Sequence, residues 1–232
     1  MNQNDYYDSH DMSEVQSAFI TKVFGWMAMA LAITGVVALY TAYTPSLLRM
    51  IFGSRIVFYG LVLGELGLVI YLSRSINRMS AQTATLTFIF YAILNGLTLA
   101  SIFLVYTSSS IASTFFITAG TFGLMAFYGH VTKRDLTKMG SLLIMALIGV
   151  ILASLVNIFF RSPVVYWITT YAGILIFVGL TAYDAQKIKN IGARGFSGEE
   201  MEQKAAVMGA LTLYLDFINL FLYMLRILGR RK

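Results

Sequence analysis

Cysteine is absent from this chain, and proline occurs only twice in its 232 residues. Without cysteine there is no disulfide framework and no cysteine-based zinc or redox site. Charged residues make up only 12% of the chain, about half of the share in a typical soluble domain. The sequence also lacks a nucleophile motif, a metal-binding motif such as HExxH and a glycine-rich phosphate loop. We therefore expect no enzymatic activity and no cofactor.

Apolar residues fill most of the sequence instead. They account for 58% of it, and the mean hydropathy is +0.73. A water-soluble protein needs more polar surface than this, which excludes a soluble enzyme and a disordered chain. The net charge of +6 does not indicate a nucleic-acid binder, because the basic residues stand between long apolar runs. This distribution is typical of a multispanning membrane protein, whose first partner is the lipid bilayer.

Seven stretches are long and apolar enough to cross a bilayer as helices. The sequence therefore predicts an all-α fold, a bundle of seven transmembrane helices in one domain over residues 20–228. Residues 1–19 form a polar tail without the basic start and short apolar core of a cleavable signal, and residues 229–232 form a basic tail. The predicted spans are residues 20–43, 56–73, 84–106, 111–131, 140–160, 164–189 and 205–228.

The orientation follows from the basic residues between the spans. With seven crossings, ten lysines and arginines lie on the side of the N-terminus and seven on the other side. The positive-inside rule then predicts a cytoplasmic N-terminus. A re-entrant last segment is the alternative, because it would bring the four basic residues at the end of the chain to the N-terminal side. The last apolar segment is long and contains no proline, which favours seven crossings.

Small residues recur at four-residue spacing in two spans. Gly60 and Gly64 form one such pair, and Ala92, Gly96 and Ala100 form a longer series. This spacing lets helix backbones approach closely in lipid. Packing inside the bundle is favoured over a homodimer contact in both cases.

Three carboxylates fall within predicted spans, where an ionisable group is costly and marks a candidate site. Asp216 lies near the middle of the last span. Thr212, Asn219 and Tyr223 share its helical face, which we expect to look into the bundle or a watery cavity. Asp184 lies near the end of the sixth span, one turn before Lys187. The structural alternative is an aspartate at the membrane interface whose charge is compensated by Lys187 and water.

The third carboxylate, Glu65, follows the Gly60–Gly64 pair in the second span. It either lines an ion path or only bonds to a neighbouring helix. Two further polar stripes are more typical of contacts between helices than of ligand binding. They are Asn95 with Thr98 and Ser101, and Ser154 with Asn157. We expect a structural role for His130. Ser197 and Glu200 match a capping box, which predicts a helix start before the last span.

Two long segments resemble the paired signature of the transmembrane Bax inhibitor motif family, in its bacterial inner-membrane branch. They are Gly179-Leu180-Thr181-Ala182-Tyr183-Asp184-Ala185-Gln186-Lys187-Ile188-Lys189 and Ala210-Leu211-Thr212-Leu213-Tyr214-Leu215-Asp216-Phe217-Ile218-Asn219-Leu220-Phe221-Leu222. The resemblance covers the chain beyond its polar N-terminus. It implies seven helices, with the last one central and wrapped by two groups of three.

The resemblance also implies a function, a pH-sensitive calcium leak channel. In that family two aspartates form a hydrogen-bonded proton sensor, and they match Asp184 and Asp216. The acidic residue of the second span matches Glu65. The family's latch arginine aligns with Ile76, so Arg74 or Arg78 is the expected substitute.

The leading hypothesis is therefore a cation leak of the bacterial inner membrane, gated by protonation of Asp184 and Asp216. The same two aspartates are the expected calcium contacts, since calcium prefers oxygen ligands. Asn219 is expected to lie on the ion path with Glu65. Two other functions remain open. One is an interaction protein that modulates a membrane-bound quality-control protease, as for some bacterial relatives, and the other is a proton-coupled solute transporter.

Overall fold

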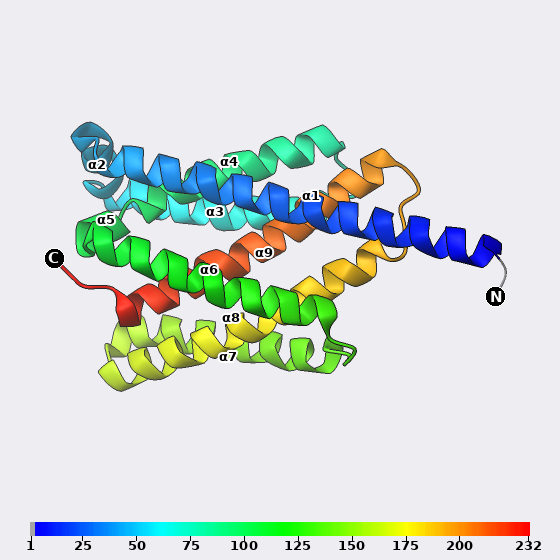
Figure 1. The fold of residues 1–232 in the computed structure, drawn as a ribbon. Coiled ribbons are helices and arrows are strands. Elements are labelled where there is room, and N and C mark those ends of the chain that lie inside the picture. The colour runs from blue at the N-terminus through cyan, green and yellow to red at the C-terminus, as the bar shows by residue number, and fades with distance from the viewer. Residues whose placement is uncertain (1–2) are drawn as a thin grey trace. The chain divides into compact units, whose positions relative to one another are not determined.

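The computed structural model describes the backbone of residues 3–232 and the side chains of residues 14–232, so residues 1 and 2 of the expected tail lie outside the described residues. Helices account for nearly all of this part of the chain (Figure 1). Their bounds are α1 Gln3–Ala42, α2 Pro45–Phe52, α3 Arg55–Ser75, α4 Ala81–Leu99, α5 Ile102–Val105, α6 Ser108–Val131, α7 Thr137–Phe160, α8 Pro163–Gly192 and α9 Glu199–Leu228.

Within the described residues, seven helices are long and apolar enough to cross a membrane, which confirms the predicted all-α membrane fold. The third predicted span is divided, because α4 ends at Leu99 and the short α5 follows. α9 is the most buried span, with 67% of its most apolar window inside the protein against 6% for α7. This burial agrees with the central position expected of the last helix.

The chain divides into two compact units. Unit 1 contains residues up to Tyr106, residues 191–214 and the last two residues. Within it, α1 packs along α4, and α3 packs against α4. Unit 2 contains residues 107–190 and 215–230, which bring α6, α7 and α8 together with the second half of α9. Each unit thus contains three of the first six spans and one half of α9.

The small-residue spacings have different outcomes in the two helices that carry them. A Cβ added to Gly96 would lie 2.7 Å from the Val37 side chain and 2.8 Å from the Thr34 carbonyl oxygen, so α4 touches α1 there. Ala92 and Ala100 are fully buried. A Cβ at Gly60 or Gly64 would meet no described atom within 4 Å. The predicted internal packing is confirmed for α4 and wrong for α3, whose glycines lie on an exposed face.

Two local signals also differ from their predicted roles. Asn157 bonds to the backbone of Ser162 at 2.8 and 3.1 Å, which closes the turn after α7, where Arg161 is left-handed with φ 50°. It therefore does not join two helices. α9 begins at Glu199 because the chain turns at Gly198, with φ 150°, a conformation that favours glycine. The predicted Ser197–Glu200 capping box is replaced by a Glu200–Lys204 ion pair of 3.0 Å.

Candidate functional site

Unit 2 brings Asp184 of α8 and Asp216 of α9 together. Both are buried, with exposed fractions of 7% and 5%, and their side chains hydrogen-bond to one another. A carboxylate can only accept hydrogen bonds, so a bond between two carboxyls requires a proton on one of them. The arrangement can therefore hold one shared proton.

The surroundings of this pair offer little other compensation for charge. No donor among the described residues reaches Oδ2 of Asp216. Thr181, one turn before Asp184, donates its hydroxyl to the Phe177 carbonyl at 2.7 Å. Phe217, next to Asp216, packs against two phenylalanines of α6, with ring centroids 5.4 and 5.5 Å apart. Lys187 acts on Asp184 through its charge, but its side chain is exposed.

Glycines on the neighbouring helices fix α8 at the position of Asp184. A Cβ at Gly129 of α6 would lie 2.0 Å from the Ala182 carbonyl oxygen, and one at Gly140 of α7 would lie 2.5 Å from the Tyr183 ring. Only glycine permits the first approach, because the obstructing atom is backbone. Neither glycine was predicted as a site residue, since isolated glycines in apolar helices carry no pairing signal.

The polar end of α8 is attached to the connection between α6 and α7. Buried Gln186 accepts from the Leu136 N–H at 2.9 Å and donates to the Arg134 carbonyl at 2.7 Å. Lys189 donates to the His130 carbonyl at 2.6 Å, so His130 contributes its backbone here, in keeping with a structural role. These bonds hold the helix just beyond Asp184.

Glu65 lies in unit 1, where it bonds to α4. Its exposed fraction is 9%. Oε2 accepts from Asn95 Nδ2 at 3.2 Å, and Oε1 accepts from the Thr98 hydroxyl at 2.9 Å. The predicted Asn95–Thr98 stripe thus joins two helices, as expected, and its partner is Glu65.

The Glu65 bonds continue through Asn95 to α9 and α1. The Tyr214 hydroxyl donates to Asn95 Oδ1 at 3.2 Å, and it lies 2.7 Å from the Thr34 hydroxyl. The Thr34 hydroxyl also donates to the Ala92 carbonyl at 2.9 Å, so it has no second proton for Tyr214. Tyr214 thus links Asn95 of α4 to Thr34 of α1. Tyr214 was not among the predicted site residues, because a tyrosine in an apolar helix is usually a packing residue.

The remaining predicted site residues lie apart from these bonds. Asn219 is half-buried and donates to the Leu215 carbonyl of its own helix at 2.8 Å. Arg74 and Arg78 are exposed, whereas Ile76 between them is buried. The roles of Asn219 on the ion path and of either arginine as latch stay predictions. Among the residues whose side chains the structure describes, no three His, Asp or Glu residues form a group that could hold a metal ion.

Comparison with known proteins gives the family. The model of the family described as inhibitor of apoptosis-promoting Bax1 matches residues 16–232. The chain belongs to the Bax inhibitor family. It is 50% identical to the inner membrane protein YbhL of Escherichia coli K12, over 92% of each chain. A protein of Borreliella burgdorferi is 47% identical over 94% of each chain, and one of Rickettsia prowazekii is 44% identical over 92% of this chain and 90% of its own.

Proposed function

We propose that this Bax inhibitor family member conducts cations, calcium among them, across the bacterial inner membrane and that protonation of Asp184 and Asp216 closes it. The observation that carries the proposal is the hydrogen-bonded carboxyl pair, buried between α8 and α9 in unit 2. A relative that is 50% identical in sequence is named an inner membrane protein, which supports a location in the inner membrane. The sequence resemblance to calcium leak channels supports the activity.

The pair couples a proton to the packing of two helices. When the shared proton leaves, the hydrogen bond is lost and two like charges remain in a buried site. Two charges about 4 Å apart repel by about 4 kcal/mol at an effective dielectric constant of about 20. An energy of this size shifts a two-state equilibrium by about three decades, in favour of a state in which α8 and α9 are further apart at this point. The carboxylate oxygens are then free for a hard cation such as calcium.

Calcium flux into liposomes, measured over a range of pH, tests this mechanism. Flux through the wild-type protein should rise with pH, because loss of the proton opens the pair. Asp184→Asn and Asp216→Asn should each flatten this pH dependence, and the double variant should add little, because the two residues act as one unit. Asp135→Asn is the matched control, since Asp135 is an exposed aspartate between α6 and α7.

Independent, additive shifts from the two substitutions would show that the aspartates do not act as a pair. Normal gating in the double variant would remove them from the mechanism. If wild-type liposomes pass no cation at any pH, the channel proposal is refuted. Co-purification with a membrane protease would then favour the interaction protein, and proton-driven solute uptake would favour the transporter.

A further inference from the structure

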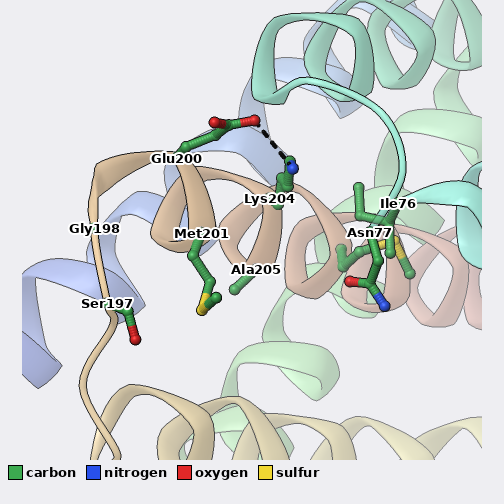
Figure 2. A pocket seen from close by; sticks show the side chains of 9 residues that line it. Ile76, Asn77, Ser197, Gly198, Glu200, Met201, Lys204 and Ala205 are labelled. Atoms are coloured by element: carbon green, nitrogen blue, oxygen red, sulfur yellow. Dashed lines mark ion pairs between the residues drawn. The ribbon is translucent and has the colours of Figure 1, made fainter.

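A pocket of about 570 Å³ lies in unit 1, where α9 begins opposite the connection between α3 and α4 (Figure 2). Ile76 and Asn77 come from that connection, Ser197 and Gly198 from the loop before α9, and the other lining residues from the first turns of α9. Because α3 and α4 are membrane spans, residues between them lie at the membrane surface. The pocket is therefore at the level of lipid headgroups.

The lining of the pocket is apolar on one part and polar on another. Met201, Ala205 and Met208 recur along one face of α9, and buried Ile76 joins them. Methionine side chains adapt to irregular apolar ligands. The polar residues are Asn77, Ser197, Glu200 and Lys204. Figure 2 shows the Glu200–Lys204 pair beside Met201 and Ala205, with Asn77 across from them. A ligand that fits this lining has a polar head and an apolar chain.

Opposite charges are held side by side at the polar part. Lys204 Nζ lies 3.0 Å from Glu200 Oε1, and the backbone of Ala81, at the start of α4, also bonds to the Glu200 carboxylate. An ammonium group has three donors and a carboxylate has about four acceptor positions, so both keep free capacity. The ion pair thus presents a fixed positive group and a fixed negative group to one ligand.

These charges select the type of headgroup. A zwitterion with a phosphate and a primary ammonium matches the pair, with its phosphate at Lys204 and its ammonium at Glu200. A purely anionic headgroup has no ammonium group to offer the Glu200 carboxylate, which lines the pocket. A choline headgroup has no N–H donor for Glu200. The lining therefore fits an ethanolamine phospholipid better than a glycerol or choline phospholipid.

We propose that this pocket is a binding site for an ethanolamine phospholipid. The headgroup bridges Glu200 and Lys204, and the first carbons of an acyl chain lie against Met201 and Met208. The volume falls in the usual range of small-molecule sites, about 300–1,000 Å³. The site is independent of the proposed cation flux.

Native mass spectrometry of the delipidated full chain with added dioleoyl phosphatidylethanolamine tests the site. We expect the wild-type protein to bind this lipid about tenfold more tightly than dioleoyl phosphatidylcholine or dioleoyl phosphatidylglycerol. Glu200→Gln should abolish the preference for ethanolamine over choline. Lys204→Gln should weaken binding of every phospholipid. The matched controls are Glu199→Gln and Lys138→Gln, which change an exposed charge that does not line the pocket.

Met201→Trp tests the apolar part without touching the ion pair. It should fill the pocket and weaken binding about tenfold in a protein that keeps its thermal unfolding midpoint, since the Met201 side chain is half-exposed. Equal affinity of the wild-type protein for the ethanolamine and choline lipids would overturn the proposal. The proposal would also be overturned if the three pocket variants bound the lipid as tightly as the two controls do. These variants are Glu200→Gln, Lys204→Gln and Met201→Trp.

Discussion

At the scale of single residues, the two buried carboxyl sites are compensated in different ways. Glu65 accepts hydrogen bonds from two neutral side chains, Asn95 and Thr98. Asp216 has the carboxyl of Asp184 as its partner, and no donor within the described part of the chain reaches its Oδ2. Neutral side chains can donate hydrogen bonds to an ionised carboxylate. A hydrogen bond between two carboxyl groups instead requires a proton that the two share. We therefore expect pH sensing at the aspartates and not at Glu65.

Glu65→Gln tests this difference. The substitution keeps the shape and removes the charge. The new amide can donate to the Thr98 oxygen, because the Thr98 hydroxyl also reaches the Asn95 carbonyl at 3.0 Å, so the bonds to α4 can be kept. We expect cation flux to fall severalfold at every pH while the pH midpoint stays in place. The measurement is liposome flux over pH, with thermal unfolding to follow stability.

Tyr214→Phe is the matched variant for Glu65→Gln. It keeps the ring contacts with Phe88 and Tyr91, both 5.9 Å away, and removes the bonds to Asn95 and Thr34. A loss of stability with normal flux in Tyr214→Phe would separate network stability from ion conduction. Unchanged flux and pH dependence in Glu65→Gln would mean that Glu65 only joins α3 to α4.

At the scale of helices, the environment of a glycine decides what a methyl group does. Gly96→Ala places a Cβ against the Thr34 backbone and should cost about 1–3 kcal/mol of stability, because α1 and α4 must move apart. Gly60→Ala and Gly64→Ala meet open space and should keep or raise stability, by up to about 1 kcal/mol each, since alanine favours a helix. Thermal unfolding in detergent measures all three. Equal destabilisation by the three changes would show that α3 is packed on its glycine face.

The start of α7 provides a pH-dependent prediction outside the membrane spans. The hydroxyl and the N–H of Thr137 both donate to Asp135, and these bonds lower the pKa of Asp135 below its ordinary value of 3.8. The ionised form is therefore favoured in the folded state, and its contribution is present above pH 3.8 and is lost as the pH falls through the lower folded pKa. Asp135→Asn should lower the unfolding midpoint slightly at pH 7, because Asp135 is exposed. The difference from the wild-type protein should shrink as the pH falls below 3.8 and through the lower folded pKa, and a difference that does not change with pH would refute the carboxylate's role.

At the scale of the whole molecule, the sequence predicts the spans and the costly groups well, because both depend on composition along one helix. Three carboxylates can be recognised from the sequence, because a carboxylate within a membrane span is costly and therefore rare. They are Asp184, Asp216 and Glu65. The partners of these groups are harder to predict. Asn95 and Glu65 were both singled out, but their contact depends on which helices are neighbours, and helical spacing does not contain that information. Gly129 and Tyr214 could not be predicted for the same reason, since their roles also depend on which helices are neighbours.

The positions of the two ends of unit 1 bear on the number of crossings. α1 begins at Gln3 at one end, while Lys232 donates its N–H to the Val105 carbonyl at the other end, at 3.0 Å (Figure 1). α9 is an unbroken helix of 30 residues, longer than the 20 or so that a crossing requires. Both observations favour seven crossings over a re-entrant last segment.

Reporter fusions at residues 1 and 232 test the topology of the molecule. Green fluorescent protein, which is fluorescent in the cytoplasm, should give a signal at residue 1, because ten of the basic residues lie on the N-terminal side. Alkaline phosphatase, which is active in the periplasm, should give a signal at residue 232, since an odd number of crossings places the two ends on opposite sides. Fusions in the connections at residues 77 and 161 serve as controls, with a cytoplasmic and a periplasmic signal, respectively. Cytoplasmic signals from both ends would require α9 to return to its side of entry, and only then would the re-entrant segment replace the seventh crossing.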